Sequence, residues 1–230
     1  MEPILETETC GIEAYESASD WQNTVLLSFT GIGHAMGGLD VQTPEFFGAG
    51  RGFDNVIFIS DLARSWGNAL DFDEIVAALR PFVAGRKIFA IGNSMGGFLG
   101  VVMSNLLEID TVVAFVPQFS VSARVLWSEH RWRNHRVHIK EFKIPSLADQ
   151  FNAKTQYYLF SSNSWPDRKH WKRFPAQPNI ENIVLKDGAH NLAAGLKKSG
   201  QLSGLIEACF TGQFSIGWMN DTLGVGARKI

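Results

Sequence analysis

The sequence has few cysteines and almost no net charge. Two cysteines, Cys10 and Cys209, occur in 230 residues, which excludes a disulfide framework, and no spacing of Cys and His matches a zinc site. The net charge of −2, from 21 Lys and Arg against 23 Asp and Glu, gives no support to general nucleic-acid binding. The acidic first residues lack the apolar stretch of a signal peptide, so we expect a cytoplasmic protein.

One uncharged run has the length of a membrane span. It covers the twenty residues 88–107, which is enough to cross a bilayer as a helix. Glycine, asparagine and serine interrupt the run at residues 92–97, and these residue types are typical of turns. We therefore predict a buried strand, a sharp turn and a buried helix, and no membrane span.

Short apolar runs alternate with helical patterns along the chain. The runs are continuous, as expected for parallel strands covered on both faces; they lie at residues 25–29, 56–59, 88–91, 112–116, 157–160 and 183–185. Helical patterns lie at residues 72–83, 95–107 and 190–210. The alternation predicts an α/β fold with a mostly parallel central sheet of about six to eight strands flanked by helices.

Single residues and local patterns predict where the elements and segments begin and end. We expect Asp71 or Asp73 to cap the helix at 72–83 and Pro81 to end it. Residues 4–15 are candidates for an antiparallel edge of the sheet. The length fits one domain over residues 1–230. Within it, we predict an insertion at 117–155, where regular patterns fail, and a loose tail at 211–230.

The most informative motif is Gly-Asn-Ser-Met-Gly-Gly at residues 92–97. It follows a predicted strand and opens a predicted helix, the context in which Gly-x-Ser-x-Gly forms a nucleophile elbow. The tight turn gives Ser94 an unfavourable backbone conformation, so its close neighbours must be small. Gly92 and Gly96 meet that need, and the helix N-terminus behind Ser94 favours a developing oxyanion.

With this motif the chain, from about residue 22 to about residue 210, resembles the α/β-hydrolase superfamily of serine hydrolases. The sequence Gly-Asn-Ser-Met-Gly-Gly is similar to the elbow of carbon–carbon bond hydrolases that cleave aromatic ring-fission products. It also occurs among small esterases. The resemblance implies the α/β-hydrolase fold with a short lid at 117–155. It also implies the chain order nucleophile, acid, histidine.

The two partners of Ser94 follow from that order. His190 is the only one of the six histidines beyond the last predicted strand, and the small residues before it resemble the family's histidine loop. Asp167 is the only carboxylate between the preceding strand and Glu181. Asp187 is the alternative acid, but it lies on the same short loop as His190. We therefore predict Ser94, Asp167 and His190 as the catalytic residues.

An oxyanion hole needs two backbone N–H groups. One is expected from Met95, after the nucleophile. The other should come from Thr-Gly-Ile-Gly-His at 30–34, which is similar to the family's His-Gly-x motif but has Thr30 in place of the His. We assign Ile32 N–H and place Gly33 beside the substrate. His34 either lines the pocket or makes a structural hydrogen bond.

Another segment resembles a structural loop of the family. Asp61 and the residues after it follow the predicted strand at 56–59 and are similar to the family's Asp-x-x-Gly-x-Gly-x-Ser loop, with Arg64 and Trp66 as departures. The family uses this Asp structurally, so Asp61 is not assigned a catalytic role.

The expected reaction is hydrolysis of a carboxylic ester or thioester through an acyl-enzyme, with no metal or organic cofactor. Three alternatives stay open: a carbon–carbon bond hydrolase, an acyltransferase with the same three residues, and a non-catalytic binding module that keeps the fold. The sequence gives no indication of the natural substrate, the acyl length or the oligomeric state.

The 117–155 insertion is where substrate choice is expected. Trp127 and Trp132 either wall an apolar acyl pocket or pack the insertion onto the domain. Ten of the 21 bases lie at 124–143 and 168–173. They either attract an anionic small-molecule or acyl substrate or form a solvated face.

Overall fold

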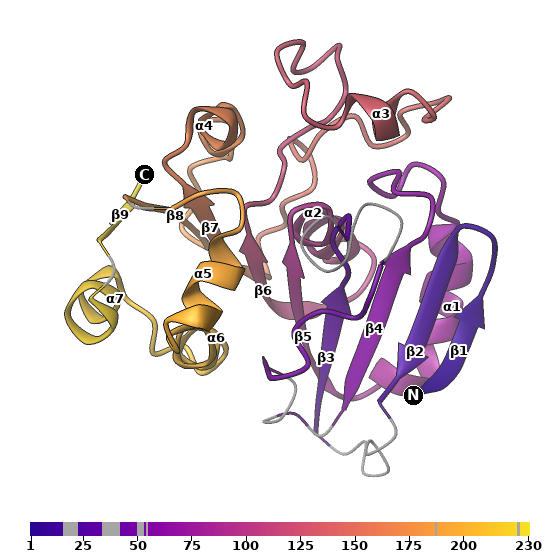
Figure 1. The fold of residues 1–230 in the computed structure, drawn as a ribbon. Coiled ribbons are helices and arrows are strands. Elements are labelled where there is room, and N and C mark those ends of the chain that lie inside the picture. Colours follow the sequence, from indigo (N-terminus) through magenta and orange to yellow (C-terminus); the bar gives the residue numbers. More distant parts are fainter. Residues whose placement is uncertain (16–22, 34–41, 50–52, 54, 187, 225) are drawn as a thin grey trace.

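The computed structural model describes residues 1–15, 23–33, 42–49, 53, 55–186, 188–224 and 226–230. In this part of the chain, nine strands form one sheet in the order β1-β2-β4-β3-β5-β6-β7-β8-β9 (Figure 1). The strands are β1 (Glu2–Glu6), β2 (Cys10–Ala14), β3 (Thr24–Phe29), β4 (Val56–Asp61), β5 (Lys87–Asn93), β6 (Ile109–Phe115), β7 (Gln156–Ser162), β8 (Ile180–Leu185) and β9 (Ala227–Lys229).

The middle of the sheet is parallel and its edges are antiparallel. Strands β4, β3, β5, β6, β7 and β8 pair in parallel, which confirms the mostly parallel sheet. The antiparallel edge expected at residues 4–15 is present as β1 and β2. The ninth strand was missed because Ala-Arg-Lys has no apolar run, and it pairs antiparallel with β8.

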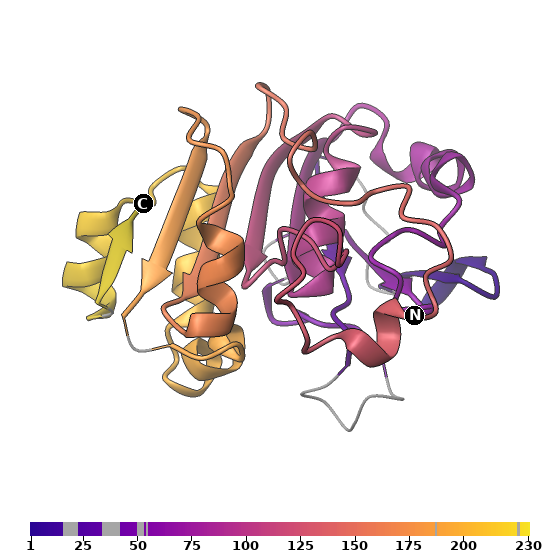
Figure 2. The ribbon, with the colours of Figure 1, turned by 90° about the horizontal axis from the view of Figure 1, so that it is seen from above.

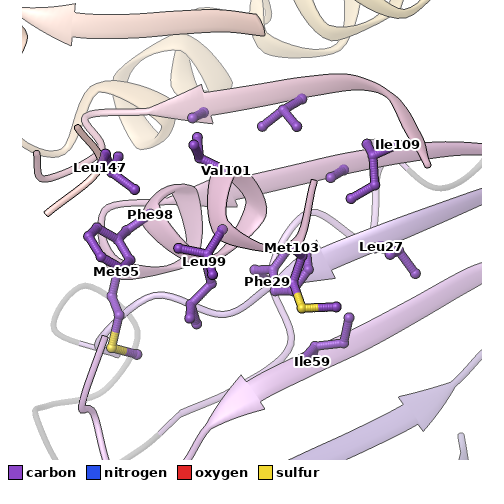
Figure 3. Packing of buried hydrophobic residues seen from close by; sticks show 14 of the residues in the cluster. Leu27, Phe29, Ile59, Met95, Phe98, Leu99, Val101, Met103, Ile109 and Leu147 are labelled. Atoms are coloured by element: carbon purple, nitrogen blue, oxygen red, sulfur yellow. The ribbon is translucent and has the colours of Figure 1, made fainter. Parts of the chain in front are cut away.

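Helices cover both faces of the sheet (Figure 2). Helices α1 (Phe72–Val83), α2 (Met95–Met103) and α4 (Trp165–Trp171) pack on one face, and α5 (Leu192–Lys198), α6 (Leu202–Phe210) and α7 (Ile216–Leu223) pack on the other. All nine residues of α2 are buried, and Phe98 and Leu99 pack among Phe29 and Ile59 of the neighbouring strands (Figure 3). This buried helix is the one that presents Ser94.

Three boundary expectations were wrong. Helix α1 begins after the cap Asp71, whose side chain accepts from Glu74 N–H, but it continues past Pro81 because Val83 is buried and Ala84 N–H still bonds to Arg80 O. The helix expected to reach residue 107 ends at Met103. Residues 211–230 are not a loose tail, since α7 buries Met219 and β9 joins the sheet.

The 117–155 segment is largely irregular and contains the short helix α3 (Arg133–Arg136). Phe119, Val121 and Leu147 anchor it, because their side chains are buried in the core beside α2. Among the described residues, no helix combines the length and the apolar character needed to cross a membrane.

Candidate active site

Ser94 lies on a strained turn between β5 and α2. Its backbone has φ 57° and ψ −115°, a conformation that non-glycine residues rarely adopt. A Cβ at Gly92 would lie 2.2 Å from the carbonyl carbon of Gly96, and one at Gly96 would lie 2.1 Å from Phe29 O. Side chains are therefore sterically excluded at both glycines, which explains the Gly-x-Ser-x-Gly pattern.

The sheet register brings the other predicted residues to the same edge. Gly92 lies opposite Phe29 in β3 and Ala114 in β6, so the carboxyl ends of these strands are level. Asp167 follows β7 within α4, and His190 follows β8. Residues that follow parallel strands thus meet above the sheet, where α/β folds place their ligand sites.

Ser94, His190 and Asp167 form one hydrogen-bonded chain. Ser94 Oγ lies 3.1 Å from His190 Nε2, and His190 Nδ1 lies 2.8 Å from Asp167 Oδ1. Because the carboxylate accepts, Nδ1 carries the ring proton and Nε2 is left to accept from the serine hydroxyl. The alternative acid Asp187 lies outside the described residues. The three predicted residues are in the geometry of an activated nucleophile.

The Asp167 carboxylate is surrounded by donors. Oδ2 accepts from Ser162 Oγ at 2.6 Å and from Ser164 Oγ at 3.2 Å, and Oδ1 also accepts from Arg131 Nη1 at 2.7 Å. Burial alone would raise the pKa of Asp167, but the His190 and Ser162 hydrogen bonds and the Arg131 charge hold it well below its usual range. Asp167 is thus a fixed carboxylate at neutral pH.

Arg131 connects this carboxylate to a second buried acid. Its Nε and Nη2 atoms bind both oxygens of Glu129, with Nη2 2.8 Å from Oε2. His170 Nδ1 accepts from Phe119 N–H at 3.0 Å, so Nε2 carries the proton and donates to Glu129 Oε2 at 2.8 Å. Burial raises the pKa of Glu129, but its bonds to His170 and Arg131 outweigh this and lower it strongly.

A glutamine side chain also contacts Ser94. Gln118 Nε2 lies 2.7 Å from Ser94 Oγ and 3.4 Å from His190 Nε2. Its Oε1 accepts from Trp66 Nε1 at 3.0 Å. Both Gln118 and Trp66 are completely buried. These contacts place the Gln118 amide, together with the His190 ring, at the Ser94 hydroxyl.

The loop after β3 carries the predicted oxyanion residue Ile32. Gly31 N–H donates a hydrogen bond to Glu45 Oε1 at 3.2 Å, and Thr30 Oγ1 forms a hydrogen bond with Ser60 Oγ. Ile32 and Gly33 follow and line the same cavity as Ser94, while Met95 begins α2 and buries its side chain. The positions of these residues fit the predicted amide donors, whose oxyanion role stays a prediction. His34 lies outside the described residues.

The cavity beside Ser94 has a volume of about 310 Å³. Its walls are formed by Ile32, Gly33, Glu45, Asn93, Ser94, Trp132, Ala189, His190 and Asn191. Asn93 Oδ1 and Trp132 Nε1 are buried without a hydrogen-bond partner among the described residues, which is rare for buried polar groups. A larger groove of about 1120 Å³ includes the first residues of β6 and none of the predicted site residues.

The two predicted lid tryptophans differ. Trp132 is buried, its ring centroid lies 5.5 Å from that of His190, and it lines the cavity. Trp127 is 77% exposed and does not line this cavity, so its assignment to the pocket wall was wrong. At this exposure Trp127 does not pack the segment onto the domain either.

Several bases of the 124–143 and 168–173 segments make internal contacts. Arg131 binds Glu129 and Asp167, Arg136 Nη1 donates to Val121 O, and Lys169 binds Ser128 O and lies 3.5 Å from the Trp165 ring centroid. These three side chains help to hold the 117–155 segment in place. An attraction for anions would therefore depend on the other bases of the two segments.

Asp61 has the structural role that the family resemblance implied. Its Oδ2 accepts from Ser65 N–H, Ser65 Oγ–H and Gly67 N–H, each at 2.9 Å. The loop that Asp61 closes includes Trp66 with φ 52°. This loop therefore fixes the indole that binds Gln118.

Sequence reasoning missed Gln118, Glu129, Arg131 and Glu45. A signal existed for Gln118, because Pro117-Gln118 directly follow the strand beside the nucleophile strand, at the edge where the site forms. Arg131 was noticed only as part of a basic segment. Its pairing with Asp167 depends on the path of an irregular segment, which no short-range pattern specifies.

Comparisons with known proteins identify the fold. No protein-family model matches the chain, and no curated protein has a similar sequence. Among solved structures, the chain is similar to the capsule O-acetyltransferase of Neisseria meningitidis serogroup A, with TM-score 0.61 and 10% identity over 88% of this chain and 93% of that one.

Two further structures extend the comparison. The α/β serine hydrolase without lid from Xanthomonas campestris matches with TM-score 0.50 and 10% identity, over 89% of each chain. The glycosylation-associated Gap123 complex of Streptococcus agalactiae matches with TM-score 0.56 and 15% identity, over 96% of this chain and 46% of that one. The chain therefore shares the α/β fold of these solved structures.

Proposed function

We propose that the protein is a serine hydrolase that cleaves a carboxylic ester or thioester through an acyl-enzyme on Ser94. The observation that carries this proposal is the chain of hydrogen bonds from Ser94 Oγ through His190 to Asp167, on a strained elbow. Strain persists where the surrounding structure enforces it, and such sites are commonly functional.

In the first step, His190 Nε2 takes the proton of Ser94 Oγ, and Oγ attacks the substrate carbonyl carbon. The carbonyl oxygen becomes an oxyanion that accepts from the backbone N–H groups of Met95 and Ile32. Asp167 holds the imidazole tautomer and stabilises the imidazolium. The imidazolium then gives its proton to the leaving alcohol or thiol, and the acyl group stays on Oγ.

In the second step, water gives a proton to His190 Nε2 and attacks the acyl carbon. The bond between the acyl carbon and Ser94 Oγ breaks, and Oγ recovers the proton from the imidazolium. The products are the free carboxylic acid and the original enzyme. His190 acts first as base and then as acid in both steps.

The cavity supports a small acyl group. At about 310 Å³ its volume is at the lower end of ligand pockets, which are roughly 300–1,000 Å³. We therefore favour short acyl groups over long alkyl chains.

Acyl transfer to an alcohol is the second candidate function. It uses the same residues, with the alcohol in place of water in the second step. The observation that favours it is the similarity in fold to a capsule O-acetyltransferase. Carbon–carbon bond hydrolysis and a non-catalytic binding role have no observation of this kind in their favour.

A panel of p-nitrophenyl esters of increasing acyl length tests the proposal, with Ser94→Ala as the matched control. Short esters should turn over only with the wild-type side chain, and equal rates in both proteins would refute the mechanism. Adding methanol or a sugar alcohol to the acetyl ester distinguishes the two candidates. A transferase gives acetylated alcohol as the main product, whereas a hydrolase gives acetate.

We also propose that the exposed bases attract an anionic substrate, and the ionic strength of the solution can test this. If exposed bases attract it, kcat/KM for the natural substrate should fall as ionic strength rises, because surface charges are screened. A kcat/KM that ignores ionic strength would contradict this attraction.

A further inference from the structure

We propose that Gln118 acts directly on the nucleophile, by donating an amide hydrogen bond to Ser94 Oγ, and that Trp66 positions this amide. The inference rests on the proposed acyl-enzyme function and adds a catalytic and a positioning residue to it. Neither residue belongs to the Ser94–His190–Asp167 chain.

The orientation of the amide follows from its neighbours. The indole Nε1–H of Trp66 can only donate, so the atom that it faces at 3.0 Å must be the amide oxygen of Gln118. The amide nitrogen therefore faces Ser94 Oγ at 2.7 Å. Because both side chains are fully buried, no solvent is available to replace either bond, and a flipped amide would leave the indole N–H unpaired.

This donor determines where the serine proton lies. Ser94 Oγ has one proton and two lone pairs. With Gln118 donating to a lone pair, the hydroxyl proton is directed to His190 Nε2, 3.1 Å away. The resting serine is thus oriented for transfer of its proton to the base.

The same bond acts in both chemical steps. During acylation, negative charge develops on Oγ as its proton moves to His190 Nε2, before the new bond to the acyl carbon passes this charge to the carbonyl oxygen. During deacylation, charge returns to Oγ as that bond breaks, until the imidazolium reprotonates it. An amide N–H held at this oxygen stabilises the charge each time without having to reorient.

The backbone is strained at Trp66 and close to Gln118, which indicates that surrounding contacts enforce the positions of both side chains. Val116, two residues before Gln118, has φ 43°, and Trp66 has φ 52°. Positive φ is unfavourable for a β-branched and for an aromatic residue and persists only where surrounding contacts enforce it. Val116 N–H bonds to Phe160 O at 2.6 Å and Trp66 lies on the loop closed by Asp61, so each turn has an anchor.

The test measures the rate at which a fluorophosphonate labels Ser94 in folded protein. Gln118→Met keeps the volume and removes the amide, and Gln118→Glu keeps the shape and replaces the donor with an acceptor. Trp66→Phe removes the N–H that orients the amide, together with part of the buried aromatic side chain. We expect labelling to slow roughly 10- to 100-fold in both Gln118 variants and less in Trp66→Phe. In ester turnover, kcat should fall while KM stays near the wild-type value.

The outcomes separate this inference from the proposed function. If the wild-type protein is labelled at Ser94 and a folded Gln118→Met variant is labelled at the same rate, Gln118 does not have the proposed role. The acyl-enzyme proposal would still stand. If that variant does not fold, an unchanged rate in a folded Gln118→Glu variant has the same meaning. An unchanged rate in Trp66→Phe would overturn the positioning role of Trp66. Wild-type protein that is not labelled at Ser94 would refute the proposed function and this inference together.

Discussion

Arg131 Nη1 lies 2.7 Å from Asp167 Oδ1, the same carboxylate oxygen that accepts from His190. A guanidinium from the irregular 117–155 segment is therefore paired with the residue that orients the imidazole. The next residue, Trp132, forms a wall of the cavity. This ion pair links the wall of the proposed acyl pocket to the residues of the proposed chemistry.

Replacing Arg131 by Gln should destabilise the fold. Glu129 is 1% exposed. Without the guanidinium its buried carboxylate keeps the hydrogen bonds from His170 Nε2 and from the backbone N–H of residue 131, but it loses its positively charged partner. Breaking one side of a buried ion pair costs about 3 kcal/mol, so the free energy of unfolding, measured with urea, should fall by about that amount.

The double variant Glu129→Gln with Arg131→Gln is the control for this effect. Because it removes both charges, it should be more stable than the sum of the single changes predicts, which is the signature of direct coupling. Strict additivity in the double-mutant cycle would show that the pair does not contribute through its charges.

Asp167→Asn should reduce kcat for a short ester by roughly 10³- to 10⁴-fold, because an amide donor favours the wrong imidazole tautomer. Asp149→Asn is a matched control, since Asp149 is exposed on the same segment as Arg131. A small effect at Asp167, similar to that at Asp149, would argue against its role as the orienting acid.

The fold and the central residues could be predicted because short-range patterns encode them. Ser94 follows from Gly-x-Ser-x-Gly between a strand and a helix, and His190 and Asp167 follow from chain order after β8 and β7. Contacts such as Gln118 with Ser94 depend on how separate loops pack. The strand β9 and helix α7 were missed for a similar reason, since their weak patterns are stabilised by tertiary contacts.

Trp132→Ala should widen the range of acyl groups that the protein accepts. Removing the indole enlarges the cavity beside His190, so the optimum in a p-nitrophenyl ester panel should move to longer chains. Trp127→Ala, at an exposed position outside the cavity, should leave the profile unchanged. An identical shift in both variants would mean that the cavity wall does not set the acyl length.

Glu45 gives the stability a pH dependence. Burial raises its pKa from 4.5 to about 7, against the opposing hydrogen bond from Gly31 N–H. The unfolded chain releases this proton at lower pH than the folded protein, so the contribution of Glu45 to stability falls as pH rises from about 4.5 to about 7.

Glu45→Gln removes this titration and keeps an acceptor for Gly31 N–H. Relative to wild type, the variant should therefore gain unfolding free energy between about pH 5 and about pH 8. Urea unfolding of both proteins at the two pH values measures this. A difference that stays constant with pH would contradict a raised pKa in the folded protein.

The central claim is that Ser94 carries the acyl group during turnover. Measuring the mass of the protein during turnover tests this claim most directly. Wild-type protein mixed with p-nitrophenyl acetate and quenched in acid within the first turnovers should gain the mass of one acetyl group, located on Ser94 by peptide mapping. Ser94→Ala should gain none. An acetyl group absent from Ser94, together with ester turnover that survives in Ser94→Ala, would contradict an acyl-enzyme at this serine.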